Sequence, residues 1–198
     1  NKKFILWINN FMEKIIISKT ASVGDNVRLA GNVVVEDNVK IVGDCFIENA
    51  VIKTGAVVES SYITDSTVGE GTTVGPFAHI KLNSKIGSNC RIGNFVEIKN
   101  SNFGNNSKCA HLTYIGDADV GQRVNLGCGV VFANYDGKEK HRSKVGDDVF
   151  IGCNCNIIAP CEIESGCFIA AGTTITKNLP TNSFCVGRVK QEVKPKRN

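Results

Sequence analysis

The chain has 198 residues, of which 42% are hydrophobic, so it can bury a sizeable core as one domain. Its formal net charge of +4 is mild, and its only dense basic run is the tail Lys194–Arg197, so we expect no nucleic-acid partner. No apolar run is long enough to span a bilayer, and we therefore expect no membrane association.

The first residues, NKKFILWINNF, carry two lysines followed by apolar residues, as a secretion signal does. The apolar run Phe4–Ile8 is short and two asparagines follow, so a cytoplasmic protein is expected instead. Asn1 is not a start residue, which favours a fragment or a processed chain. The nine cysteines are odd in number and form no CxxC, which predicts small, buried, reduced side chains.

Residues 4–16 predict an amphipathic helix, within an N-terminal helix and linker segment at 1–17. The apolar residues that share its predicted face are Phe4, Ile8, Phe11, Met12 and Ile15. Such a helix would cap the first turn of the fold that follows or connect it to a further domain.

From residue 22 to 176 an aliphatic side chain returns about every six positions, often followed by glycine. The clearest series are Val68, Val74, Ile80, Ile86, Ile92, Ile98 and Val145, Ile151, Ile157, Ile163, Ile169, Ile175. A period of six fits short strands separated by tight corners, and so predicts an all-β parallel β-helix over 18–178. Three such hexads make one triangular coil of 18 residues, giving roughly eight coils over 22–176. Residues 179–198 form a C-terminal segment that ends in the basic tail.

The repeat predicts where each side chain points. The aliphatic position i and position i−2 face inward, positions i−1 and i+1 face outward, and position i+2 lies at a corner. Residues 18 apart stack on neighbouring coils, about 4.8 Å apart. Residues 133–144, ANYDGKEKHRSK, lengthen one hexad by seven, so they must protrude as a loop, where function tends to lie.

Several residues have no role in packing such a solenoid. His111 follows Cys109 by two positions, which places its imidazole at a corner. Lys81 and Lys99 face outward and stack on adjacent coils, where their like charges repel unless an anion bridges them. Tyr114 and Asn125 also face outward.

Small residues occupy three further corners. They are Cys128, Cys153 and Ala171, and the last two are 18 apart. Such a column would line a groove suited to an extended ligand that reaches backbone amides, although small residues are also what tight turns prefer.

Several stretches resemble a known bacterial family. They are VGPFAHIKLNSKIG, IGNFVEIKNSNFGNNSKCAHLTYIGDADVGQRVNLGCG, ANYDGKEK, VGDDVFIGCN, IAAGTTIT and VGRVKQ. They resemble the acetyltransferase half of the bifunctional enzyme glucosamine-1-phosphate acetyltransferase / N-acetylglucosamine-1-phosphate uridylyltransferase, closely over 68–191 and loosely over 18–67. The resemblance implies a left-handed β-helix, which the spacing does not establish, and a homotrimer with active sites between subunits.

The resemblance also implies a reaction and assigns residues to it. Acetyl would pass from acetyl-CoA to the amine of glucosamine 1-phosphate, giving N-acetylglucosamine 1-phosphate for UDP-N-acetylglucosamine and cell-wall precursor synthesis. His111 matches the general base, and the backbone N–H at Cys128 matches the oxyanion donor. Substrate-binding positions are Lys81, Lys99, Tyr114, Asn125 and Lys140. Acetyl-CoA positions are Cys128, Asn134, Tyr135, Cys153, Ala171 and Arg188. The implied chemistry requires no metal.

The sequence departs from the family pattern in places. Lys81 stands where the family commonly has arginine, and Cys128 and Cys153 replace residues such as alanine and serine. No Gly-rich nucleotide-binding sequence precedes the repeats, so we do not expect uridylyl transfer from this chain.

Three alternatives remain open at this point. One is a hexapeptide-repeat acyltransferase acting on another amino sugar, and one is a catalytically silent trimeric scaffold. The third is a β-helical zinc enzyme of the carbonic anhydrase type, which needs three converging histidines and has only His79, His111 and His141 to supply them.

Overall fold

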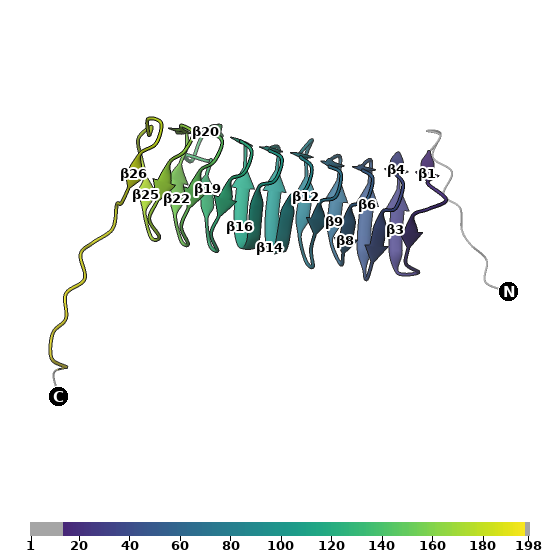
Figure 1. The fold of residues 1–198 in the computed structure, drawn as a ribbon, viewed down its shortest axis with the longest axis horizontal. Helices are drawn as coiled ribbons and strands as arrows, with labels where there is room; N and C mark the ends of the chain where they lie inside the picture. Colours follow the sequence, from purple (N-terminus) through teal and green to yellow (C-terminus); the bar gives the residue numbers. More distant parts are fainter. Residues whose placement is uncertain (1–13, 197–198) are drawn as a thin grey trace.

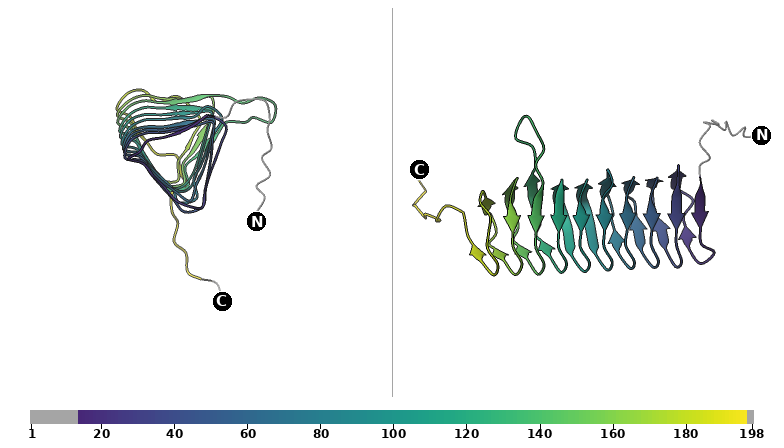
Figure 2. Two further views of the ribbon diagram at one scale, coloured as in Figure 1. Left: turned by 90° about the vertical axis from the view of Figure 1, so that its right-hand side faces the viewer. Right: turned by 90° about the horizontal axis from the view of Figure 1, so that it is seen from above.

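The computed structural model describes residues 14–196, and these contain strands, turns and loops but no helix. The chain winds into a stack of coils with a triangular cross-section, as the end-on view in Figure 2 shows. Figure 1 shows the stack from the side, with β1 and β26 at opposite ends of it. All pairings between the named strands are parallel, so the fold is the predicted parallel β-helix.

Each of the three faces is a ladder with one strand from each coil it crosses. Face A, a nine-stranded sheet, consists of β1 (Ile15–Ile17), β4 (Val33–Val35), β7 (Val51–Ile52), β10 (Thr67–Val68), β13 (Lys85–Ile86), β15 (Asn102–Phe103), β17 (Ala118–Val120), β20 (Ser143–Val145) and β23 (Glu162–Ile163). Face B consists of β2 (Ser22–Val23), β5 (Lys40–Val42), β8 (Val57–Glu59), β11 (Thr73–Val74), the first part of β14 (Arg91–Lys99), the first part of β16 (Lys108–Gly116), β18 (Asn125–Leu126), β21 (Phe150–Ile151), β24 (Phe168–Ile169) and β26 (Phe184–Cys185).

Face C follows face B along the chain. It consists of β3 (Val27–Ala30), β6 (Cys45–Glu48), β9 (Tyr62–Thr64), β12 (His79–Lys81), the second parts of β14 and β16, β19 (Val131–Ala133), β22 (Asn156–Ile158) and β25 (Thr174–Ile175). Because β14 and β16 continue round the corner between faces B and C, these two faces form one 17-stranded sheet.

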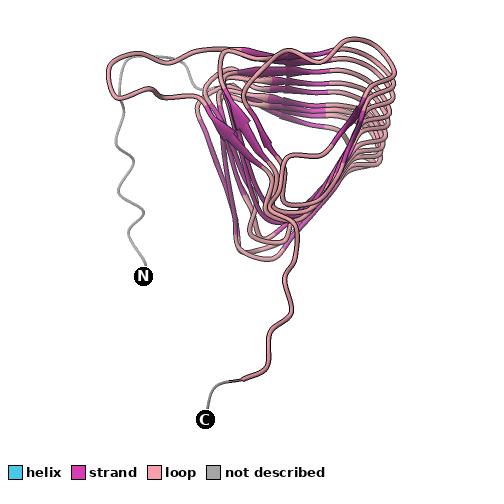
Figure 3. Ribbon diagram, turned by 90° about the vertical axis from the view of Figure 1, so that its left-hand side faces the viewer, coloured by secondary structure: helices cyan, strands magenta, loops and turns pink. Residues whose placement is uncertain are grey.

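The step between paired residues on consecutive coils is not constant. Lys81 pairs with Lys99, a step of 18, whereas Lys85 pairs with Asn102, a step of 17. Asp119 pairs with Lys144, a step of 25, because the loop between β19 and β20 lies within that coil. Figures 2 and 3 show this loop leaving the triangle at one corner, as the lengthened hexad predicts.

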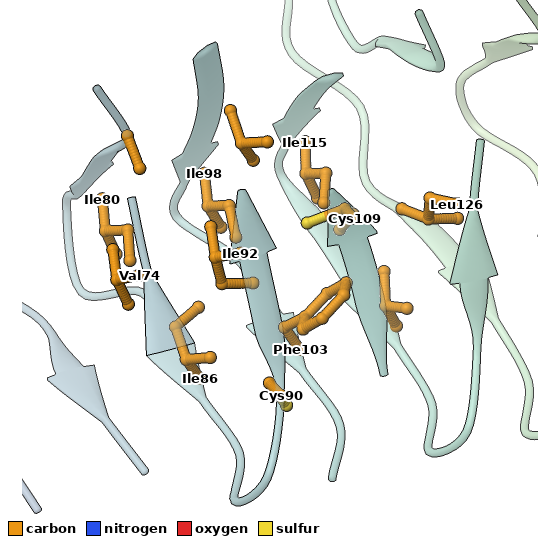
Figure 4. Packing of buried hydrophobic residues seen from close by; sticks show 14 of the residues in the cluster. Val74, Ile80, Ile86, Cys90, Ile92, Ile98, Phe103, Cys109, Ile115 and Leu126 are labelled. Atoms are coloured by element: carbon orange, nitrogen blue, oxygen red, sulfur yellow. The ribbon is translucent and has the colours of Figure 1, made fainter. Parts of the chain in front are cut away.

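The core fills the triangle from inside, as Figure 4 shows for its middle coils. Ile80 and Ala78, at positions i and i−2, are 0% and 2% exposed, and His79 between them faces outward as predicted. The ladder thus places side chains of the same kind above one another on consecutive coils, which buries apolar surface continuously along the solenoid axis.

The N-terminal helix prediction is wrong at its end. Ile15 and Ile16 belong to β1, which pairs with β4 on face A, because pairing with a neighbouring strand satisfies the backbone there without a helix. The rest of the predicted helix lies outside the described residues. At the other end of the solenoid, β26 pairs with β24, beyond the last predicted hexad.

The cysteines do not all follow the prediction of burial. All nine are free, and Cys45, Cys90, Cys109, Cys155, Cys161 and Cys167 are buried. Cys128 and Cys153 are exposed, because corner positions turn side chains out of the core, and Cys185 is intermediate. Burial raises the pKa of the Cys109 thiol, which keeps it neutral.

Within residues 14–196 there is no helix of the length and apolarity that a membrane span needs.

Candidate active site

Three lysines gather where face C ends and the protruding loop begins. Lys81 and Lys99 are paired in the ladder between β12 and β14, as the 18-residue spacing predicts. The Lys81 ammonium lies 2.9 Å from the Glu97 carboxylate, and the Lys99 ammonium lies 3.5 Å from that of Asp117. The side chain of Lys140, in the loop, lies close enough to Lys99 to shift the pKa of Lys99. We call Lys81, Lys99 and Lys140 the lysine cluster.

Asp117 contacts several side chains of this region, and it was not predicted from the sequence. Its carboxyl group is 7% exposed and also accepts hydrogen bonds from the side chains of Asn100, at 2.5 Å, and Asn134. Asn100 and Asp117 occupy the same corner on consecutive coils, two positions after Ile98 and Ile115. The register therefore contained a signal for this residue.

The charges in the lysine cluster act on one another. Burial acts to raise the pKa of Asp117, but the hydrogen bonds from Asn100 and Asn134 and the charge of Lys99 outweigh it and lower that pKa. Burial acts to lower the pKa of Lys99, and the neighbouring Lys140 and Asp117 raise it. The pKa of Lys140 is lowered because Lys99 lies beside it. The three ammonium groups of the lysine cluster face two carboxylates, those of Glu97 and Asp117. The remaining positive charge favours binding of an added anion.

Tyr114 and Asn134 adjoin the lysine cluster. The Asn134 amide nitrogen lies 3.5 Å from the Tyr114 hydroxyl and donates to Asp117. A Cβ added at Gly116 would lie 2.4 Å from the Tyr114 hydroxyl oxygen and 2.8 Å from the Asn134 amide nitrogen. Glycine at position 116 is what allows these two side chains to meet over the strand.

The loop between β19 and β20 is fixed at its base. Tyr135 and Lys140 form an antiparallel bridge, so the loop doubles back on itself and returns Lys140 toward face C. Arg142 then forms a two-pronged ion pair with Asp119, with N···O distances of 2.7 and 2.6 Å, and donates to the backbone of Asn100 and Ala118. The Tyr135 ring is exposed.

His111 lies on the corner between faces B and C and is exposed, as predicted. Asn94 is its partner in the ladder on the preceding coil, and the Asn94 side-chain oxygen lies 3.0 Å from the His111 Nδ1. Because an amide oxygen only accepts, this bond places the imidazole proton on Nδ1 and leaves the lone pair on Nε2. Asn94 thus orients the ring and determines which nitrogen carries the proton when the imidazole is neutral. Asn94 was not identified from the sequence.

The small corner residues form the predicted column below His111. The pairs Cys109 with Leu126, Leu126 with Ile151 and Ile151 with Ile169 set this register. We call the column of His111, Cys128, Cys153 and Ala171 the corner strip. It spans three coil spacings, about 14 Å at about 4.8 Å each.

The glycines beside the corner strip let consecutive coils approach closely. A Cβ at Gly127 would lie 2.6 Å from the Cys153 nitrogen, and one at Gly152 would lie 2.5 Å from the Ala171 nitrogen. A larger residue at either position would therefore collide with the backbone of the next coil. Arg188 ends the strip, where its guanidinium donates to the Ala171 carbonyl at 2.8 Å.

Asn125 is not brought together with the other predicted substrate-binding residues. It lies on face B, where its ladder neighbours are Lys108 and Phe150, whereas Lys99 and Tyr114 lie on face C. Its half-buried side chain cannot reach across the corner that separates the two faces.

An apolar ridge runs along the same corner as His111. Phe77, Phe95 and Leu112 are 61%, 58% and 60% exposed, and the two phenyl rings stack at 5.6 Å. Their φ angles are +60°, +57° and +41°, an unusual backbone conformation for such bulky residues. A shallow groove of about 340 Å³ lies beside this ridge and is lined by Phe95, Glu97, Leu112 and Tyr114, among others.

The histidines do not assemble a metal centre in the described part of the chain. Residues 14–196, which include His79, His111 and His141, contain no group of three His, Cys, Asp or Glu side chains placed to hold a metal ion. His141 is engaged by Asp136 within the loop, at 2.7 Å.

Comparison with known proteins gives two matches to family models and many to whole proteins. A family described as the GMPPB C-terminal domain matches residues 11–84, and one described as bacterial transferase hexapeptide (six repeats) matches residues 142–177. The bifunctional protein GlmU of Clostridium perfringens is 55% identical over 144 residues, which cover 73% of this chain and 32% of that protein. GlmU of Clostridium acetobutylicum is 51% identical over 166 residues, covering 84% of this chain and 36% of that protein.

This chain is homologous to part of GlmU. The resemblance noted in the sequence is thereby confirmed. The chain spans about a third of the length of these GlmU relatives, so the activity of the whole protein does not transfer to it automatically.

Solved structures support the fold. The crystal structure of LpxA, a UDP-N-acetylglucosamine acyltransferase from Bacteroides fragilis, has a TM-score of 0.62 at 19% identity, covering 85% of this chain and 70% of that one. The UDP-N-acetylglucosamine acyltransferase from Francisella novicida has a TM-score of 0.53 at 17% identity, covering 85% and 66%. The fold is the left-handed parallel β-helix, as the resemblance implies.

Proposed function

We propose that this chain transfers an acetyl group from acetyl-CoA to the amine of glucosamine 1-phosphate. The observation that carries the proposal is that most residues matching the family's sites, with the exception of Asn125, lie at the two edges of face C. A base, His111, and the corner strip lie at one edge, and a cationic cluster lies at the other. The substrate class is the one that the resemblance implies, and the match to GlmU supports that resemblance.

The lysine cluster is our proposed site for the sugar phosphate. Lys140 lies beside Lys99, and Lys81 is the ladder neighbour of Lys99 on the preceding coil, so a phosphate dianion would relieve the repulsion among them. Lysine at position 81 offers a point charge rather than the planar fork of arginine, which suits a phosphate but orients it less strictly. Tyr114 would position the sugar beside it. Asn134, which matches an acetyl-CoA position of the family, lies beside Tyr114 and Asp117 and not on the corner strip.

His111 is our proposed general base. An ammonium has no lone pair, so the substrate amine must lose a proton before or during its attack on the thioester carbon. With its Nδ1 proton held by Asn94, His111 can accept that proton at Nε2. Attack forms the C–N bond, and collapse of the tetrahedral intermediate expels CoA as the thiolate. A corner amide, with the Cys128 N–H as the family-based candidate, would stabilise the oxyanion.

The corner strip is our proposed site for the extended arm of acetyl-CoA. Cys153 and Ala171 are exposed, and their backbone N–H groups would suit the amide groups of such an arm, while Arg188 at the end of the strip would suit a phosphate. Tyr135, exposed in the loop, would add contact area.

We also propose that the active form is a homotrimer. The apolar ridge of Phe77, Phe95 and Leu112 is exposed in the single chain and adjoins His111. A second copy that covers the ridge could bring its own Asn125 to the sugar, which one chain cannot do.

The test is an acetyl-transfer assay on the purified chain with a panel of amino sugars. We expect turnover of glucosamine 1-phosphate, with little turnover of amino sugars that lack the phosphate, because these do not engage the lysine cluster. Preference for another amino sugar would support the alternative acyltransferase, and failure to bind CoA at equilibrium would support a silent scaffold. We expect no pyrophosphate release from UTP.

A further inference from the structure

Two thiols stand exposed at the same corner of consecutive coils. Cys128 and Cys153 are exposed, whereas the other cysteines of the chain are buried or intermediate. The pairing of Leu126 with Ile151 places the two cysteines in register, and the Asn154 N–H donates to the Cys128 carbonyl at 2.8 Å. Their side chains therefore leave the corner strip as direct neighbours.

The spacing between the coils suits a metal ion held between the two sulfurs. Matched positions on neighbouring strands lie about 4.7–4.9 Å apart. A linear sulfur–metal–sulfur unit with bonds of about 2.3 Å, the length of zinc–thiolate bonds, spans about 4.6 Å. A disulfide holds its Cβ atoms about 3.8 Å apart, somewhat closer than this spacing.

The number of ligands decides which ion fits. Residues 14–196 offer no third acidic, cysteine or histidine side chain that completes a group at this place, so a four-coordinate zinc site cannot form here. Thiolates favour soft ions such as monovalent copper, which is stable with few ligands.

We propose that Cys128 and Cys153 bind one monovalent copper ion as a dithiolate site. Both thiols lose a proton, two Cu–S bonds form, and no electron is transferred. The ion would lie within the corner strip, where we place acetyl-CoA, so the loaded chain is expected to be unable to acetylate. Only this last consequence rests on the proposed function.

The first experiment titrates the reduced, metal-free chain with monovalent copper under anaerobic conditions, against a chromophoric copper(I) chelator and without acetyl-CoA. We expect one tightly bound ion per chain. Loss of a residue that merely hydrogen-bonds to a metal ligand weakens metal binding by about 10–100-fold. Because Cys128→Ser and Cys153→Ser each remove a ligand itself, each should weaken copper binding by more than that. Cys185→Ser is the matched control and should retain binding. Tight binding that survives in either corner variant, or that disappears in Cys185→Ser, overturns the proposal.

A second experiment needs no variant. The unmodified chain is treated with iodoacetamide before and after copper loading, and its peptides are analysed by mass spectrometry. Copper should protect Cys128 and Cys153 together, and alkylation of either one in the loaded chain overturns the proposal. Neither experiment depends on acetyl transfer, so their failure leaves the proposed function standing, and inactivity of the enzyme leaves copper binding testable.

Discussion

A histidine serves as a base only if one ring nitrogen is free of a proton and available. In this chain the neighbouring coil orients the ring, because Asn94 accepts from Nδ1 of His111 across the ladder and leaves Nε2 as the nitrogen that can take up a proton. The hexad register thus does more than build the fold: it delivers the orienting partner of the imidazole to the same corner, one coil away.

Replacing His111 by alanine tests its role as the base. We expect kcat to fall about 10²–10⁴-fold, the usual contribution of general acid–base catalysis. The melting temperature should barely change, because an exposed corner side chain fills no core volume. Asn94→Ala should give a smaller fall in kcat, since it frees the imidazole without removing it. Steady-state kinetics with thermal melts measure both, and near-normal kcat in His111→Ala would remove the assignment.

Replacing Lys99 by alanine should have two effects. It removes one cation of the lysine cluster, which raises KM for the sugar phosphate. It also leaves Asp117 with one partner fewer, at a cost of about 1–3 kcal/mol in the free energy of unfolding. Lys40→Ala, an exposed lysine near the start of the solenoid, is the matched control. A variant with unchanged KM would contradict the phosphate site.

The same variant has a predictable pH dependence. The pKa of Asp117 is lowered in the folded chain, so its ionised form stabilises the fold above its unfolded pKa. That contribution is lost as the pH falls through the folded pKa. The difference in melting temperature between the unmodified chain and Lys99→Ala should therefore shrink on acidification. A constant difference across that range would show that the ion pair does not stabilise the fold.

Much of the site could be predicted from one number, the period of six. It placed His111 at a corner and Lys81 and Lys99 on adjacent coils, and the structure confirms both placements. Asn94 and Asp117 were missed because their roles depend on which neighbour a side chain contacts, and the period gives only direction. The catalytic and binding roles themselves came from the resemblance and remain proposals.

At the level of elements, the protruding loop is the part that the repeat does not determine. Its length was visible as an interrupted hexad, but its conformation depends on pairs such as Tyr135 with Lys140 and Arg142 with Asp119. Those contacts join residues whose positions no repeat relates. In the N-terminal segment a regular pattern was misleading. The apolar spacing over residues 4–16 predicted a helix, but Ile15 and Ile16 pair as a strand.

Arg142 is the residue through which the loop can be tested. Arg142→Gln removes both bonds to Asp119 and should allow Lys140 to move away from Lys99. We expect KM for the sugar phosphate to rise several-fold while kcat at saturation changes little, since His111 lies on another corner. Lys138→Gln, an exposed loop residue of the same charge, should behave as the unmodified chain. Equal effects from the two substitutions would mean that charge, not loop position, is responsible.

At the scale of the whole molecule, the proposed site is incomplete within a single chain. Asn125 faces away from the lysine cluster, and the apolar ridge beside His111 has no cover within residues 14–196. The face of Asn125 follows from the hexad register, which aligns Leu126 with Cys109 and not with Ile115. The exposure of the ridge does not follow from it, because the pattern describes one solenoid and says nothing of its hand or its neighbours. The trimer was expected from the resemblance, and the exposed ridge supplies a physical reason for it.

Phe95→Asp tests the ridge as the subunit contact. Aspartate tolerates the φ of +57° at this exposed position, so the solenoid should still fold, whereas a charge in the contact should separate the subunits. Light scattering should report a mass reduced to one third, and activity should disappear although His111 and the lysine cluster are intact. An active monomer would overturn the trimer.

Mixing two inactive variants tests whether the site is shared. If each site takes His111 from one chain and Asn125 from another, trimers that combine His111→Ala and Asn125→Ala chains contain some sites in which both residues are intact. Co-expression of the two should then give more activity than either variant alone. The expected recovery is partial, because the intact residues also pair with substituted ones. Mixed trimers that form but show no recovery would place each site within one chain, and Asn125 would lose its role in binding the sugar.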